Sequence, residues 1–98
     1  MEKKIIVSKR FRTDAIRIHQ HLIQKFSAQT GLTFLNKIEE RVELLSKYPA
    51  IGKLSQKKSN VRSVTLTPHN LLFYRATDNK IELLCLFDTR RDPLSRPY

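Results

Sequence analysis

The spacing of apolar residues changes at Tyr48-Pro49, and this change limits the folds that the chain can adopt. Before it, apolar side chains recur every three or four residues, as on one face of an α-helix, near residues 9–27 and 30–47. After it, stretches near residues 61–67, 71–77 and 80–88 alternate or are apolar throughout, as in β-strands. Proline lacks the amide donor that a continuing helix needs, so the second helix is predicted to end there.

The two helical stretches are predicted to form an antiparallel hairpin. Residues 3–8 read as a strand, and Ser8 is placed to cap the helix that follows. The helical pattern pauses around residues 27–31, where a short turn is expected. The apolar stripes consist of Phe11, Ala15, Ile18, Leu22 and Phe26 in the first helix and of Leu35, Ile38, Val42 and Leu45 in the second. The predicted core is Phe11, Ile18, Leu22, Leu35, Ile38, Val42 and Leu45, together with Leu83 and Cys85 of the last strand.

The remaining strands are predicted to form a three-stranded antiparallel meander. A polar loop over residues 53–60 precedes it, and residues 68–70 and 78–79 provide its two turns. The last strand is apolar on both faces, so it is expected in the middle of the sheet, with the helices on at least one side. The order is strand, helix, helix and three strands, which is an α+β fold. With 98 residues, the chain is expected to form a single domain over residues 1–98.

The charge of the chain suggests an anionic partner. The formal net charge is +10, and residues 44–77 hold six Lys or Arg and no Asp or Glu. Such a run repels itself in a compact fold, which favours nucleic acid or an acidic protein segment as partner. Any one of these cations could instead belong to a solvated face. The predicted target-binding residues are Lys53, Lys57, Lys58, Arg62, Arg75, Arg90 and Arg91.

The composition argues against several classes of site. The chain has only two glycines and no glycine-rich phosphate loop or nucleophile elbow, and we expect neither a cofactor nor a metal. Cys85 is the only cysteine and is expected to be a small buried strand residue. The N-terminus has no signal-peptide core, and no apolar run is long enough to span a membrane. A cytoplasmic protein without membrane contact is expected.

A few residues could carry chemistry of their own. Asp88 and Asp92 flank the Arg90-Arg91 pair and are expected to hold these arginines by ion pairs rather than to act as a base. His69 lies in a turn and is a weak acid or base candidate, since no partner is identified for it. Tyr98 could stack on a base or donate a proton, or pack on the surface as terminal tyrosines commonly do.

Several short motifs together resemble a known family. They are residues 48–52 (YPAIG), the strand start at residues 61–62 (VR), residues 72–75 (LFYR) and residues 86–93 (LFDTRRDP). With the order of elements, they resemble the RelE/ParE superfamily of bacterial toxins across nearly the whole chain. This resemblance implies a toxin of a type II toxin–antitoxin pair, of the kind that takes part in plasmid stabilisation, inhibiting growth until a cognate antitoxin neutralises it.

The superfamily contains ribosome-dependent mRNA endonucleases similar to RelE and DNA gyrase poisons similar to ParE. The resemblance makes Arg62, Arg91 and Tyr98 the matches to the endonuclease residues, whereas Val64 and Leu71 stand where that pattern has cations. Losing two cations weakens a metal-independent RNA-cleaving site. We therefore favour gyrase over the ribosome and mRNA as the target, and do not expect enzymatic activity. The third hypothesis is a non-toxic module that binds nucleic acid or an antitoxin.

Overall fold

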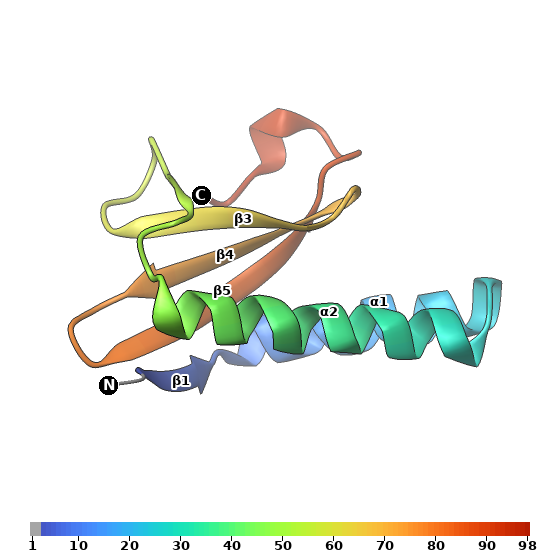
Figure 1. The fold of residues 1–98 in the computed structure, drawn as a ribbon. Helices are drawn as coiled ribbons and strands as arrows, with labels where there is room; N and C mark the ends of the chain where they lie inside the picture. The colour runs from blue at the N-terminus through green and yellow to red at the C-terminus, as the bar shows by residue number, and fades with distance from the viewer. Residues whose placement is uncertain (1–2) are drawn as a thin grey trace.

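The computed structural model describes residues 3–98 and confirms the predicted order of strand, helical hairpin and meander (Figure 1). Its elements are β1 (Lys4–Val7), α1 (Lys9–Lys25), α2 (Ala28–Lys47), β2 (Lys53–Leu54), β3 (Val61–Thr67), β4 (Asn70–Ala76), β5 (Lys80–Asp88) and a 3-10 turn at Pro93–Ser95. In Figure 1 α2 lies in front of α1; the two helices pack against each other, and α1 also packs on β5. Neither helix of the described segment is apolar over a length that could cross a membrane.

The strands form one mixed sheet in the order β1-β5-β4-β3-β2. β1 is parallel to β5 and every other neighbouring pair is antiparallel, so β5 lies inside the sheet as predicted. The prediction of a loop over residues 53–60 was wrong at its start, because β2 pairs with β3 through Lys53↔Ser63 and Leu54↔Arg62. A strand of two residues is too short to produce an alternating pattern.

Side chains at the start of α1 continue the contacts of β1 with β5. Ser8 caps α1 as predicted, since its Oγ accepts from the Phe11 amide at 3.0 Å, and it also donates to the Leu84 carbonyl at 2.8 Å. The buried Asp14 accepts from the Leu86 amide at 3.1 Å and from Arg17 at 3.1 Å. The pairing of β1 with β5 ends at Leu83. Beyond it, the side chains of Ser8 and Asp14 provide hydrogen-bond partners for backbone groups of β5 that β1 does not reach.

The helix boundaries and one buried face differ from the prediction. Ser27 caps α2 by accepting from the Thr30 amide at 3.1 Å, so α1 ends earlier and α2 begins earlier than expected. Phe26 follows the end of α1 and is 65% exposed. Leu35 is 37% exposed, whereas Phe34 is 3% exposed, so the buried face of α2 is rotated by one residue. The other predicted core residues do lie in or against the core. Fully buried are Phe11, Leu45, Leu83 and Cys85, and half-buried against the core are Ile18, Leu22, Ile38 and Val42.

The sheet carries an apolar cluster on each side. The larger cluster packs against the helices, and the smaller one, around Phe73 and Cys85, packs against the C-terminal Tyr98. The register between β4 and β5 shifts by one residue, because Phe73 pairs with Cys85 whereas the next residue, Tyr74, pairs with Leu83. This irregularity places Leu83 in the larger cluster and Cys85 in the smaller one, although they are two residues apart. Burial raises the pKa of the Cys85 thiol to about 11, as befits a structural residue.

Candidate functional site

A groove of about 800 Å³ lies between the helical hairpin, the β3–β4 turn and the end of β5. We call it the hairpin groove. Its apolar lining includes the buried Phe34 and Leu86 and the half-buried Ile18 and Leu22. Its basic lining residues are Arg17, His21 and Lys25 from α1, Lys37 from α2, His69 from the turn, and Arg90 and Arg91 after β5. Asp88 is its only acidic lining residue within residues 3–98, so the groove combines an apolar interior with an excess of positive charge.

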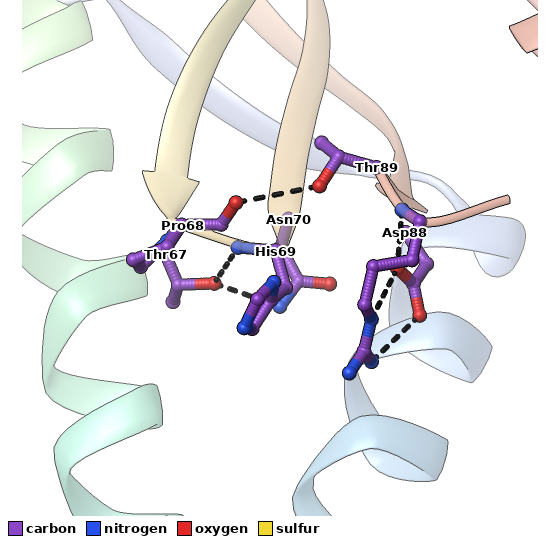
Figure 2. Close-up of polar contacts among 7 residues, drawn as sticks. Thr67, Pro68, His69, Asn70, Asp88 and Thr89 are labelled. Carbon is purple, nitrogen blue, oxygen red and sulfur yellow. Dashed lines mark hydrogen bonds and ion pairs between the residues drawn. The ribbon is translucent and has the colours of Figure 1, made fainter.

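Polar contacts hold the β3–β4 turn against the end of β5 (Figure 2). Thr67 Oγ1 accepts from the His69 amide at 3.2 Å and from Asn70 Nδ2 at 2.9 Å. The Thr89 amide donates to the His69 carbonyl at 2.9 Å, and the Thr89 hydroxyl donates to the Pro68 carbonyl at 3.3 Å. These contacts fix where the chain leaves the sheet, and so they position Arg90 and Arg91 at the groove.

Asp88 and Arg90 form a two-pronged ion pair beside the groove. Arg90 Nε lies 3.0 Å from Asp88 Oδ1, and Nη2 lies 2.9 Å from Oδ2. The side-chain and backbone hydrogen bonds from Arg90 lower the pKa of Asp88 to about 2, and the pKa of Arg90 is raised. The ion-pair prediction is thus confirmed for Asp88. Asp92 instead caps the 3-10 turn by accepting from the Leu94 amide at 2.9 Å.

The Asp88–Arg90 ion pair should make the stability of the protein depend on pH in acid. The pKa of Asp88 is below its ordinary value of 3.8, so its contribution to stability is complete above about pH 4 and is lost as the pH falls toward 2. Arg90→Ala should raise the pKa of Asp88 toward its ordinary value, measured by NMR titration of the carboxyl group. Arg91→Ala is the matched control and should change that pKa less. A midpoint near the ordinary value in the unmodified protein would contradict this.

Arg91 differs from Arg90 in having a free side chain. Within residues 3–98 its guanidinium makes no hydrogen bond or ion pair, while its amide donates to the Asp88 carbonyl at 3.1 Å. It is exposed and lines the hairpin groove. Of the two arginines singled out in the sequence, Arg91 is therefore the one available to an incoming anion.

Arg62 is engaged by the protein's own backbone. Its Nη1 donates to the Gly52 carbonyl at 2.8 Å and to the Ala50 carbonyl at 3.2 Å. Its partner across the sheet, Tyr74, donates from its hydroxyl to the Pro49 carbonyl at 2.8 Å and accepts from the Gly52 amide at 3.0 Å. Burial raises the pKa of Tyr74, which keeps this hydroxyl protonated. Arg62 and Tyr74 together clamp the turn that follows α2, and two of the five N–H donors of the Arg62 guanidinium, both on Nη1, bind backbone carbonyls there.

The C-terminal segment lies on the smaller apolar cluster. The rings of Tyr98 and Phe73 have centroids 5.5 Å apart, and the Arg96 guanidinium lies 5.3 Å from the Phe73 centroid. Lys57 Nζ donates to the Arg96 carbonyl at 2.7 Å, and Ser55 Oγ donates to a Tyr98 oxygen at 3.1 Å. The terminal tyrosine thus packs against the sheet, on the side away from the helices.

The remaining predicted target-binding residues are dispersed. Lys53 and Lys58 are exposed on β2 and the loop after it, and Arg75 is half-buried on β4 between its partners Val61 and Glu82. Within residues 3–98, only Arg90 and Arg91 of the predicted set line the hairpin groove.

The three residues matched to the endonuclease pattern do not meet. Arg62 is at the start of β3 and faces the turn after α2, whereas Arg91 follows the end of β5, next to the far end of β3. Tyr98 lies on the opposite side of the sheet from Arg62. They occupy three separate places in the fold.

The sequence analysis missed the basic residues that the helices contribute to the groove. Arg17, His21 and Lys25 are spaced by four residues and therefore follow one side of α1. The sequence signal for this basic side of α1 was the four-residue spacing, which runs beside the apolar stripe of Ile18 and Leu22.

The sequence-family model of the ParE toxin of the type II toxin–antitoxin system parDE matches residues 5–93. The chain belongs to this toxin family. The match covers both helices, every strand apart from the first residue of β1, and the arginine pair after β5, so the family resemblance inferred from the motifs is confirmed. No curated protein sequence showed significant similarity to the chain.

Solved structures of related toxins share the fold. The chain is similar to a chain of the chromosomal ParDE system from P. aeruginosa, with a TM-score of 0.75, 19% identity, and coverage of 89% of this chain and 96% of that one. A chain of the E. coli DinJ-YafQ toxin–antitoxin complex gives a TM-score of 0.64 at 18% identity, covering 92% and 96%. The S. aureus YoeB dimer gives a TM-score of 0.62 at 19% identity, covering 87% of this chain and 94% of that one. The neighbours of this ParE-family chain therefore include RelE-like folds as well.

Proposed function

We propose that this ParE-family toxin inhibits growth by acting on DNA gyrase, and that a cognate antitoxin silences it. The observation that carries the choice of target is the state of Arg62. Its Nη1 donates to the carbonyls of Ala50 and Gly52, which holds the guanidinium against the turn after α2 and commits two of its five N–H donors to the protein's own backbone. Val64 and Leu71 add no positive charge nearby.

Metal-independent RNA cleavage requires cations aimed at the charge that develops on the phosphate. Each well-placed donor is worth roughly 2.7–4 kcal/mol, by analogy with single oxyanion-hole donors. Arg62, Arg91 and Tyr98 are too dispersed to act on one phosphate together. Inhibition by binding requires only a complementary surface, and the hairpin groove with Arg91 at its edge supplies one.

The antitoxin fits the hairpin groove best as an amphipathic acidic helix. Apolar side chains at i, i+3 and i+4 spacing would cover Phe34 and Leu86, and carboxylates would meet Lys25, Lys37 and Arg91. The same surface would then be hidden from the target, which accounts for neutralisation without a conformational change in the toxin.

Association with the antitoxin should depend strongly on salt. Because the toxin carries a net charge of +10, the association rate should fall by at least about tenfold as salt rises from about 10 mM to about 500 mM. The dissociation rate should change far less, since apolar contacts hold the bound state. Stopped-flow or surface plasmon resonance measurements give both rates. An association rate that is constant over this range would show that long-range steering is unimportant.

Growth under induced expression tests the assignment. We expect arrest when the chain is induced alone and recovery when the neighbouring antitoxin frame is induced with it. Absence of arrest would favour the non-toxic module. Mapping RNA ends inside ribosomes in the same cells separates the two toxic mechanisms, since codon-positioned cuts that disappear in Arg91→Ala would make the protein an mRNA endonuclease instead.

A further inference from the structure

A second groove, of about 560 Å³, lies between α2, β2 and β3. We call it the edge groove. Its cations are Lys37 and Arg41 from α2 and Lys53 from β2, and no Asp or Glu lines it within the described part of the chain. Lys37 and Arg41 are four residues apart, so they lie on one side of α2. The edge groove therefore presents three positive groups from two elements and no carboxylate to neutralise them.

Arg41 provides the independent observation that an acceptor is missing from the edge groove. Its Nε is buried and has no hydrogen-bond partner among residues 3–98, and its side chain forms no ion pair there. A buried donor without an acceptor is unfavourable. A small rotation of the guanidinium would present this donor to the groove. A bound anion would then remove the penalty, since the planar guanidinium fork matches two oxygens of one anionic group.

The backbone of β3 adds a further donor beside these cations. β2 pairs with β3 only at Arg62 and Ser63. The Ser55 amide donates to the Val61 carbonyl, which places the backbone groups of the odd-numbered β3 residues on the β2 side. Thr65 lies beyond the end of β2, so its outward amide is unpaired within residues 3–98. Arg and Lys side chains together with backbone amides are the groups that contact nucleic-acid phosphates.

The edge groove continues into the hairpin groove, because Lys37, Thr67 and Pro68 line both. Within residues 3–98 the only acidic residue that lines either groove is Asp88, and its charge is paired with Arg90. A basic surface that extends over two grooves suits a partner with a negative charge at every repeat. A DNA backbone has this property, whereas a peptide segment carries carboxylates only at some positions.

We propose that the edge groove binds the phosphate backbone of the DNA that gyrase holds; this inference rests on the gyrase assignment above. Arg41 pairs with the oxygens of one phosphate, and Lys53 and the Thr65 amide donate to its neighbours. Contacts of this kind position a protein on DNA without reading the base sequence. The toxin would then contact gyrase through the surface around Arg91 and the DNA through the edge groove.

Binding of the free toxin to a short DNA duplex, followed by fluorescence anisotropy, tests the site without gyrase. Arg41→Ala should weaken binding at least about tenfold, because it removes hydrogen bonds to a charged group. It should also reduce the slope of log affinity against log salt by about 0.9, the value for one phosphate contact on B-form DNA. Lys53→Ala should reduce the slope in the same way.

Arg12→Ala is the matched control for this measurement. It removes the same charge from an exposed position of α1 outside both grooves, so it should leave the salt slope nearly unchanged. Thermal unfolding of the free variants verifies that they fold. Equal losses of affinity and slope in Arg41→Ala and Arg12→Ala would overturn the inference. Tighter binding to single-stranded RNA of the same length, lost in Arg41→Ala, would make this an RNA contact and overturn it as well.

Trapping of cleaved DNA on gyrase separates failure of this inference from failure of the gyrase assignment. Arg41→Ala should require at least about ten times more toxin than Arg12→Ala for the same amount of cleaved DNA, in line with its weaker hold on the duplex. Equal potency of the two variants would overturn the inference and leave the gyrase assignment standing. If the unmodified toxin traps no cleaved DNA, the gyrase assignment fails, and the DNA source named here fails with it.

Discussion

Gly52→Ala is expected to destabilise the protein by about 3 kcal/mol or more, because the substitution both overpacks a buried site and disrupts hydrogen bonds. A Cβ at Gly52 would lie 2.5 Å from Tyr74 Oη and 2.9 Å from Arg62 Cβ. The turn would have to withdraw from the two residues that clamp it. In a domain of this size the melting temperature should fall by roughly 10–20 °C.

Gly31→Ala is the matched control, since it makes the same chemical change in α2. There an added Cβ would meet Ile23 Cγ1 at 2.8 Å and ring atoms of His19 at 3.1 Å. These side chains can shift, and alanine favours a helix over glycine by about 1 kcal/mol, so the net effect should be small. Thermal or urea unfolding measures both variants. Equal melting temperatures for Gly52→Ala and the unmodified protein would show that the clamp does not hold the turn.

Phe34→Ala should cost about 3–5 kcal/mol, the range for removing a buried aromatic side chain. Phe34 is 3% exposed in the larger apolar cluster and also lines the hairpin groove. Leu35→Ala is the control one residue away. Because Leu35 is 37% exposed, its truncation should cost less than about 1 kcal/mol.

Urea unfolding of the two variants would decide which face of α2 is buried. The structure requires the larger loss at Phe34, whereas the spacing of apolar residues in the sequence placed Leu35 in the core. A larger loss for Leu35→Ala would mean that α2 packs on the face inferred from the sequence.

This difference shows how far periodicity can predict packing. Residues 34–45 hold apolar side chains at Phe34, Leu35, Ile38, Val42, Leu44 and Leu45. Stripes starting at 34 or at 35 both have helical spacing. Only contact with the sheet decides between them. By contrast, the end of α2 before Tyr48-Pro49 and the capping role of Ser8 follow from local chemistry, and both were predicted correctly.

The candidate site was less predictable than the fold, because charge in a sequence does not show what a charge contacts. Arg62 and Arg91 look alike as cations near strand ends. Arg62 donates to two backbone carbonyls because the turn after α2 lies against the start of β3, whereas the Arg91 side chain has no partner within residues 3–98. Among the described residues 3–98, the buried Nε of Arg41 without a hydrogen-bond partner and the part of β3 that β2 leaves unpaired are likewise properties of packing, which no local pattern encodes.

The central functional proposal, that the toxin acts on gyrase through the surface around Arg91, is tested most directly with purified gyrase and plasmid DNA. We expect the toxin to trap cleaved DNA on gyrase, Arg91→Ala to reduce this effect greatly, and Arg12→Ala to retain it. The antitoxin should abolish it. Unchanged gyrase activity at saturating toxin, together with ribosomal mRNA cleavage that requires Arg91, would contradict the account.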